Sequence, residues 1–298
     1  MIRLGIVDFD TSHAVEFTRR LNHVGIAEDQ WVEGARVVAG VPGVSEVAPE
    51  VIPKNLETLK GYGVAILGDP ADLFGKVDAV LVEAVDGSVH LARAMPFLEK
   101  GMPTYVDKPF ACSVADARAM ARVAMQKHVP LMSSSSLRYA PEVVAAQGGG
   151  GPAGAILGVS TYGPAPTHPR NPGLFHYGIH PVEILFTLMG AGCRRVTCLS
   201  TPGAEVVTGI WGDGRVASVR GIREGQADYG FTVFGKKGVQ TQGVSTKYIY
   251  RELLKRIVAM FETREAPIDL RETLEIVAFI EAARKSAEAG GAPVELEV

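Results

Sequence analysis

Short apolar runs and helical segments alternate through the first 133 residues of this 298-residue chain. Runs such as Ile2 to Val7, Ala35 to Val41 and Ala79 to Val82 are dominated by apolar residues, as is typical of strands that are buried on both faces. Helical segments such as His90 to Lys100 separate them. This alternation predicts a parallel sheet with helices on both faces, so we expect an N-terminal α/β domain over residues 1–133.

The pattern changes in the second part of the chain. After Gly154, apolar segments recur at hairpin spacing, with turn signals such as Gly212-Asp213-Gly214 between them. We therefore expect residues 134–298 to form an α+β domain with an open antiparallel sheet and helices. The serines Ser133 to Ser136 and the glycines Gly148 to Gly151 flank the crossover, and such runs of small residues are typical of a linker or loop.

Composition narrows the functional classes. The formal net charge of −3 and the lack of a basic stripe argue against nucleic-acid and membrane partners. The three cysteines, Cys112, Cys193 and Cys198, lack metal-ligand spacing and are expected to be reduced thiols. No signal peptide and no apolar run approaching about 20 residues is seen, so we expect a cytoplasmic protein.

The tripeptide Asp107-Lys108-Pro109 follows a predicted strand, Thr104 to Val106. Ligands bind at the carboxyl ends of the strands in open α/β sheets. Proline restrains the preceding residue to extended geometry, which would aim the Lys108 ammonium, and the Lys-Pro bond itself can be cis. The tripeptide alone favours a simpler interpretation, a surface lysine before a proline that starts a helix.

Several motifs in order give the chain a family resemblance. Asp107-Lys108-Pro109 resembles the Glu-Lys-Pro motif of the Gfo/Idh/MocA family of nicotinamide-dependent sugar and polyol dehydrogenases. Further segments are similar to that family's later motifs: Leu137 to Pro141, Gly178 to Glu183, Tyr229 to Gly238 and Pro267 to Leu296. The resemblance implies a Rossmann-like first domain, NAD or NADP as cofactor, a small-molecule substrate such as a sugar or polyol, and a homodimer or homotetramer.

The resemblance also implies catalytic and substrate-binding residues. His180 is expected to act as acid/base and Lys108 to position the substrate hydroxyl, with His176 as a further catalytic candidate. Substrate contacts are expected from Arg138, His168, Arg170 and Glu183.

The cluster His176, His180 and Glu183 also has the appearance of a metal-binding set. Pro181 places His180 at or before a helix start and His176 outside the helix. We therefore predict no metal site.

The turn after the first strand departs from the family. Asp8, Asp10 and His13 stand where a dinucleotide-binding turn carries glycines, and carboxylates there repel a diphosphate. Cofactor contacts are nevertheless expected from the turn and from the loops after two later strands: Phe9, Thr11, Ser12, His13, Asp86, His90, Asp107 and Lys108. The alternative is that Asp8, Asp10 and Thr11 only cap the following helix.

Two questions stay open at this level. No acidic residue follows Val41 to bind a ribose hydroxyl, so the sequence does not decide between NAD and NADP. The favoured function is hydride transfer between a nicotinamide cofactor and a sugar, polyol or related hydroxy compound. The alternative is a protein of the same fold that has lost ordinary dinucleotide binding and acts as a lyase or hydrolase, or as a non-catalytic binding protein.

Overall fold

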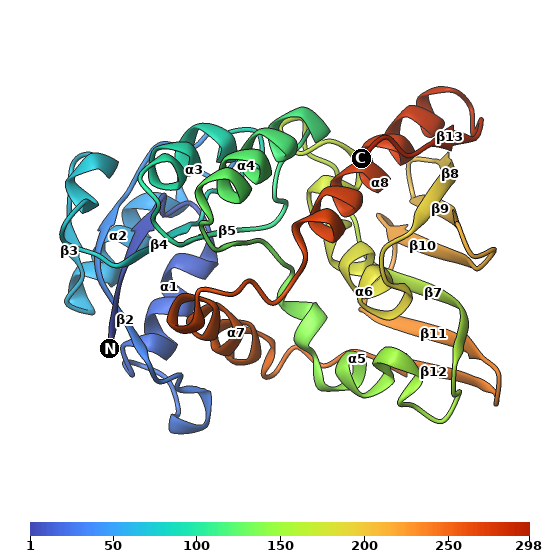
Figure 1. Cartoon of the computed structure of the whole chain (residues 1–298), viewed down its shortest axis with the longest axis horizontal. Helices are drawn as coiled ribbons and strands as arrows, with labels where there is room; N and C mark the ends of the chain where they lie inside the picture. The colour runs from blue at the N-terminus through green and yellow to red at the C-terminus, as the bar shows by residue number, and fades with distance from the viewer. The chain divides into compact units, whose positions relative to one another are not determined.

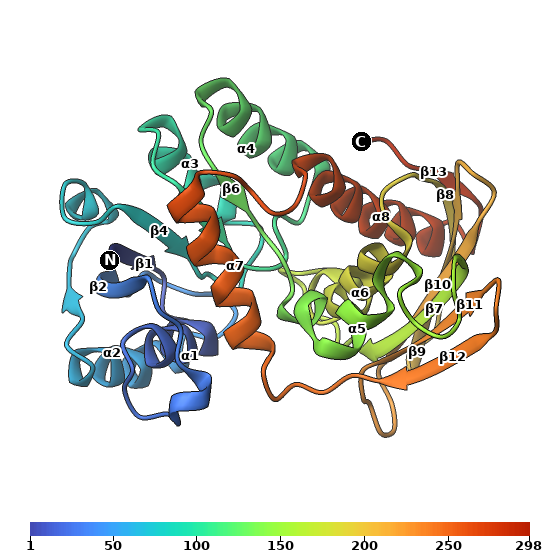
Figure 2. The ribbon, with the colours of Figure 1, turned by 60° about the horizontal axis from the view of Figure 1, so that its bottom comes forward.

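Six parallel strands form the sheet of the first half of the chain, in the order β3-β2-β1-β4-β5-β6. The computed structural model describes residues 1–298. Figures 1 and 2 show α1 and α2 on one face of this sheet and α3 and α4 on the other. The predicted Rossmann-like domain is confirmed. Its elements are β1 Ile2–Val7, α1 Ser12–Leu21, β2 Ala35–Val41, α2 Val51–Gly61, β3 Ala65–Ile66, β4 Ala79–Val82, α3 His90–Glu99, β5 Thr104–Val106, α4 Val114–Lys127 and β6 Leu131–Met132.

The second half of the chain builds a seven-stranded sheet in the order β12-β11-β7-β10-β9-β8-β13. In Figure 1, α6 and α8 lie against one face of this sheet. Its elements are α5 Pro141–Ala146, β7 Ile156–Pro164, α6 Ile179–Met189, β8 Cys193–Ser200, β9 Ala204–Trp211, β10 Val216–Ile222, β11 Gly230–Gly235, β12 Val239–Gly243, α7 Ile249–Thr263, α8 Leu270–Glu288 and β13 Val294–Glu295.

The second sheet is mixed, which corrects the expected antiparallel sheet. β10 runs parallel to β7, with Val216 opposite Gly158, whereas its other neighbour β9 is antiparallel. The hairpin spacing correctly indicated the β8-β9-β10 meander. It could not indicate that β7, which precedes α6, lies between β10 and β11.

The chain divides into two compact units, and the helix α7 departs from the expected division. The first unit comprises Met1–Ala111, Ala115–Ser134 and Tyr250–Leu270, and the second comprises the remaining residues. The boundary expected after residue 133 is one residue from the break at Ser134. Nearly all of α7, which we expected in the second domain, belongs to the first unit, where Tyr250 packs edge-on against His13 and Phe17 of α1.

The serine run is not the open linker that its composition suggested. All four residues from Ser133 to Ser136 are buried. The Ser135 hydroxyl accepts a hydrogen bond from the Leu137 N–H at 3.1 Å and so caps a short 3-10 helix at Ser136–Tyr139. These serines are therefore fixed parts of the two cores.

The three cysteines are free thiols. Burial raises the pKa of Cys193 and of Cys198 to about 12, and the nearby carboxylates of Glu275 and Glu205, respectively, add to the effect. Neither buried thiol therefore ionises near neutral pH. No helix in the structure has both the length and the apolar character that crossing a membrane requires.

The contact between Phe9 and Gly40 gives a stability prediction for the first unit. A Cβ at Gly40 would lie 2.7 Å from the Phe9 ring, whereas a Cβ at Gly61, at the end of α2, would meet nothing within 4 Å. We expect Gly40→Ala to lower the free energy of unfolding by about 1–3 kcal/mol through overpacking. Gly61→Ala should raise it by up to about 1 kcal/mol, because alanine has the higher helix propensity. Urea unfolding of both variants checks this; equal stability would contradict the packing described.

Candidate functional site

Asp8 lies at the carboxyl end of β1 in a left-handed conformation, with φ +70°. One of its carboxylate oxygens accepts a hydrogen bond from Arg93 Nε at 2.9 Å, while Oδ1 is buried and accepts none. Burial is the main reason why the pKa of Asp8 is raised to about 6. Gly43 must be glycine here, since a Cβ at this position would lie 1.7 Å from Asp8 Oδ1.

A cavity of about 400 Å³ opens beside Asp8, at the carboxyl ends of β1, β2 and β3. Most of the residues that line it are apolar or glycine, and Asp8 and Arg93 are the charged ones. The lining residues are Val7, Asp8, Val41, Pro42, Gly43, Val44, Leu67, Gly68, Pro70 and Arg93. This edge of a parallel α/β sheet is where ligands bind. The sequence analysis missed the cavity, because its signal is the joint position of three loops.

Hydrogen bonds from neighbouring residues fix the turn that follows Asp8. Thr11 is the N-cap of α1, and its hydroxyl accepts from the His13 N–H at 3.3 Å. The Asn55 side chain donates to the carbonyls of Phe9 and Thr11 at 2.8 and 2.9 Å. Ser12 is exposed at the first position of α1.

Phe9, an expected cofactor-binding residue, is buried in the turn. Its ring is fully buried against Gly40. Its N–H donates to Pro42 O at 3.0 Å, and its carbonyl accepts from Asn55. Both backbone polar groups of Phe9 are thus engaged within the protein, and its contact with a cofactor stays a prediction.

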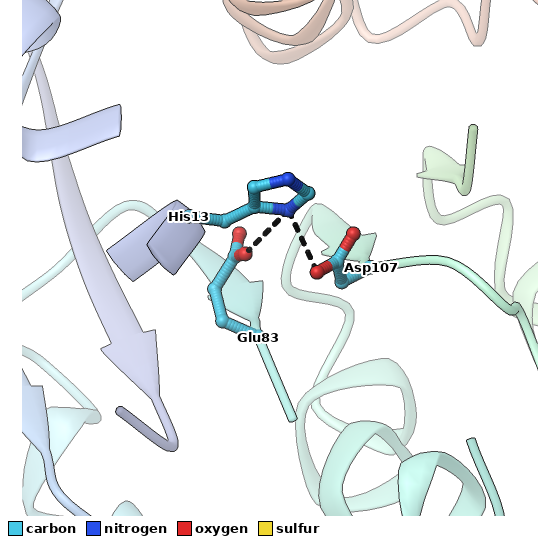
Figure 3. A group of neighbouring side chains, drawn as sticks. All are labelled: His13, Glu83 and Asp107. Carbon is cyan, nitrogen blue, oxygen red and sulfur yellow. Dashed lines mark hydrogen bonds and ion pairs between the residues drawn. The ribbon is translucent and has the colours of Figure 1, made fainter. Parts of the chain in front are cut away.

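His13, Glu83 and Asp107 form a buried cluster (Figure 3). His13 is in the first turn of α1, and Glu83 and Asp107 directly follow β4 and β5. His13 Nδ1 lies 2.7 Å from Asp107 Oδ2 and 3.8 Å from Glu83 Oε2. The His13 ring also stacks on Phe17, with the ring centroids 4.8 Å apart. Fingerprint glycines would leave this space empty; here an imidazole fills it.

Burial and neighbouring charges shift the pKa values of the two carboxyl groups in the cluster. Burial and the neighbouring charge of Asp107 raise the pKa of Glu83 well above its ordinary value. Burial also disfavours ionised Asp107, but His13 and Lys108 outweigh it and lower the pKa of Asp107. Asp107 Oδ1 accepts from the Lys108 N–H at 2.7 Å, so the cluster borders directly on the candidate catalytic lysine.

The His90 ring lies between two loops. The ring is fully buried, with Nδ1 2.8 Å from Pro109 O and Nε2 2.7 Å from Ala84 O. Both ring nitrogens lie within hydrogen-bond distance of backbone carbonyls, so His90 connects the loops around the cis Lys108-Pro109 bond, and its contact with a cofactor stays a prediction. Asp86 accepts from the backbone N–H and the hydroxyl of Ser88 and shapes the neighbouring turn.

The second unit brings three of the predicted histidines together. The ring centroids of His168 and His176 are 5.5 Å apart. The Tyr177 ring lies between His176 and His180, with centroid distances of 4.9 Å to His176 and 5.8 Å to His180. Tyr229 meets His180 at 5.7 Å and was missed by the sequence analysis. His180 is the second residue of α6 and His176 lies outside the helix, as Pro181 indicated.

Ser135 orients the His180 ring. Its Oγ lies 2.7 Å from His180 Nδ1, and both residues are buried. The serine run gave no sequence signal for this contact, because its composition suggested a linker. His180 belongs to the second unit and Lys108 to the first, and their expected cooperation stays a prediction.

Arg138 and Glu183 bind each other. Arg138 Nε lies 2.9 Å from Glu183 Oε2, and Arg138 Nη2 lies 2.6 Å from Glu272 Oε1. Burial raises the pKa of Glu183, against the opposing effect of Arg138. These ion pairs join the short helix after the serines to α6 and α8, so contact of Arg138 or Glu183 with a substrate stays a prediction. Arg170 is on the half-buried loop beside His168.

Comparison with known proteins bears on this geometry. Residues 40–135 match the model of an oxidoreductase family with an NAD-binding Rossmann fold, Gfo/Idh/MocA. The resemblance to the Gfo/Idh/MocA family is confirmed over these residues. The match begins within β2, so β1 and the turn from Asp8 to His13 lie outside it. The expected class of cofactor, a nicotinamide dinucleotide, agrees with the family.

Two curated relatives are similar in sequence to parts of this chain. The chain is 32% identical over 150 residues to the dehydrogenase aclE of Aspergillus oryzae, and 30% identical over 117 residues to a Salmonella typhimurium protein named as an oxidoreductase, YceM. These matches cover 48% and 39% of this chain and 38% of each curated relative.

A solved structure is similar over its full length. The myo-inositol dehydrogenase of Lactobacillus casei, in complex with NAD(H) and myo-inositol, superposes with a TM-score of 0.77 at 16% identity. The superposition covers 100% of this chain and 97% of that one. At this identity the similarity establishes the two-domain fold.

The raised pKa of Asp8 predicts a pH-dependent stability. Folded Asp8 holds its proton up to about pH 6, whereas the unfolded chain releases it near pH 4. Between these values the folded state binds more protons, so the Asp8 contribution to stability falls as pH rises and is constant above about pH 6. We expect the stability of Asp8→Asn relative to wild type to increase by up to about 3 kcal/mol from pH 4 to pH 7.

Urea unfolding at several pH values between 4 and 7 measures this difference. Asp72→Asn, which removes an exposed carboxylate of the same unit, is the matched control and should stay parallel to wild type. A constant difference between Asp8→Asn and wild type across this range would show that folding does not raise the pKa of Asp8.

Proposed function

We propose that the protein is an NAD(P)-dependent oxidoreductase that transfers a hydride between the cofactor and a sugar, polyol or related hydroxy compound. The observation that carries this proposal is the cavity beside Asp8, at the carboxyl ends of β1, β2 and β3 of a Rossmann-like sheet. The family match and the relatives named as dehydrogenases support it.

The cavity fits the adenosine half of a dinucleotide. Asp8 Oδ1 is a buried acceptor without a hydrogen-bond donor, and a ribose hydroxyl would supply one. In this proposal Asp8 takes the role of the acidic residue that is missing after β2. Gly43 and Gly68 keep the walls free of side chains, and Arg93 is the cation at the rim. When bound, the nicotinamide ring accepts or returns the hydride.

His180 supplies the acid/base chemistry in this proposal. Oxidation of an alcohol requires a base to accept the hydroxyl proton, and imidazole is suited to this near neutral pH. Ser135 fixes the ring through Nδ1, so we assign the proton transfer to Nε2. Lys108, held by the Asp107 carboxylate and by the proline after it, orients the substrate hydroxyl.

The proposal predicts saturable binding of a reduced dinucleotide. Titration with NADH and NADPH, followed by tryptophan fluorescence and calorimetry, should give a dissociation constant in the micromolar range. Gly68→Trp should abolish binding, because its ring would fill the cavity. Gly61→Trp adds the same ring to α2 away from the cavity and should bind as wild type does. If neither NADH nor NADPH binds, the proposal of a dehydrogenase is refuted.

The catalytic assignment predicts distinct effects of three substitutions. Lys108→Ala and His180→Ala should each abolish turnover with retained folding. Ser135→Ala should lower kcat and change the pH profile of kcat without changing KM greatly, since it loosens only the orientation of His180. Steady-state kinetics on the sugar or polyol found by screening measures this. Full activity of Lys108→Ala and His180→Ala would refute the assignment.

One observation favours a second candidate. Asp8, Asp10 and His13 replace the glycines over which a diphosphate normally lies, and the His13 N–H is already used by Thr11. These features favour a protein of the same fold with lyase or hydrolase activity, or a non-catalytic binding protein. The nucleotide titration separates the two candidates.

We also propose a homodimer or homotetramer formed through the second sheet. Four exposed apolar side chains, Val239, Phe234, Val216 and Ile210, lie in one cross-strand row from β12 to β9, with Gly158 of β7 between Phe234 and Val216. The row lies on the face opposite the buried side chains of the same strands. A contiguous apolar row of this kind is typical of an interface.

A further inference from the structure

In the proposed hydride transfer, Asp107 binds the Lys108 backbone through Oδ1, whereas Glu83 has no assigned role. We propose that the cluster of His13, Glu83 and Asp107 binds one divalent ion of the first-row transition metals, such as Zn²⁺, through His13 Nδ1 and the two carboxylates. This inference does not depend on the proposed function, since it rests on three side chains of the first unit alone.

The geometry of the cluster suits a metal ion. One ligand atom from each residue lies within 4.8 Å of the other two. His13 Nδ1 is 2.7 Å from Asp107 Oδ2 and 3.8 Å from Glu83 Oε2. Nitrogen and oxygen ligands about 2.0–2.2 Å from a zinc ion lie roughly 3–4 Å from one another. Small side-chain movements would therefore bring the three groups into coordination distance.

Glu83 provides an independent indication that something is bound. Its side chain is fully buried, and neither carboxylate oxygen has a hydrogen-bond partner. Figure 3 shows the carboxylate directed toward His13. Leaving a buried carboxylate without a donor costs several kcal/mol. A metal ion removes this cost, because it coordinates the oxygens that no protein group reaches.

With Asp10, Glu83 and Asp107 all ionised, the charges around the cluster favour a cation. Asp10 interacts with Glu83, which makes three buried carboxylates with Asp107, and Lys108 is the cation that acts on Glu83 and Asp107. If His13 is neutral and coordinates through Nδ1, the local charge is −2. One divalent ion neutralises it. The competing occupant is a proton on Glu83, which would neutralise only part of this charge.

The ligand set selects the kind of metal. Imidazole together with carboxylates suits Zn²⁺, Mn²⁺ or Fe²⁺, whereas Mg²⁺ prefers oxygen ligands and retains its water. The sequence analysis predicted no metal site, because it examined ligands that are close in sequence. His13, Glu83 and Asp107 are far apart in the chain and are brought together only where β4, β5 and α1 meet.

The test measures metal binding by the whole chain, without nucleotide. Protein stripped with a chelator is titrated with Zn²⁺ in a calorimeter, with Mg²⁺ as the comparison, and the melting temperature is recorded with and without Zn²⁺. We expect one Zn²⁺ per chain, a higher melting temperature and no saturable heat with Mg²⁺. Substitution with Co²⁺ should give visible absorption bands from the bound ion.

Two variants and a matched control locate the site. Glu83→Gln and His13→Gln should each weaken Zn²⁺ binding by at least about tenfold and remove the rise in melting temperature. Glu16→Gln removes a carboxylate of the same helix outside the cluster and should bind Zn²⁺ as wild type does. Binding by both cluster variants at wild-type affinity would overturn the proposal.

The wild-type measurements keep the test decisive if a variant does not fold. Wild-type protein that shows neither saturable Zn²⁺ heat nor Co²⁺ absorption bands would also overturn the proposal and leave a proton on Glu83 as the occupant. Because nucleotide is absent throughout, the result is separate from the outcome of the NADH titration.

Discussion

The hydrogen bond between His13 and Asp107 connects most of what is distinctive in the first unit. It joins the first turn of α1 to the end of β5, and the His13 ring in turn contacts Phe17 and Tyr250 of α7. Asp107 uses its other oxygen to bind the Lys108 backbone, so the same carboxylate that binds the helix also positions the candidate catalytic amine. An imidazole in this position therefore determines both the packing of two helices and the placement of a reactive group.

A glycine at position 13 would leave room for a diphosphate above the helix N-terminus, whereas this chain fills that room with side chains. The space beside the helix holds Asp10, His13, Glu83 and Asp107, all buried. Buried carboxylates at a helix N-terminus and an incoming diphosphate carry the same sign of charge. Positive charge from Lys108, Arg93 or a bound metal ion is what would make such a surface acceptable to an anionic cofactor.

The sequence predicted the features that local patterns determine. The parallel sheet followed from apolar runs alternating with helices, Thr11 as an N-cap followed from its side chain, and the position of His180 at a helix start followed from Pro181. Other features depend on contacts between distant residues. The parallel pairing of β7 with β10, the assignment of α7 to the first unit and the burial of Ser135 against His180 carry no local signal. The His13 cluster and the cavity beside Asp8 were missed for the same reason.

The burial of two cysteines has a practical consequence for chemical work on the protein. Thiol reagents and oxidants attack the thiolate, and the pKa values of about 12 keep Cys193 and Cys198 protonated at neutral pH. Cys112, which is half-buried beside Asn171, is the remaining thiol. Of the three cysteines, Cys112 is therefore the one to choose for attaching a probe, since the other two are buried and protonated at neutral pH.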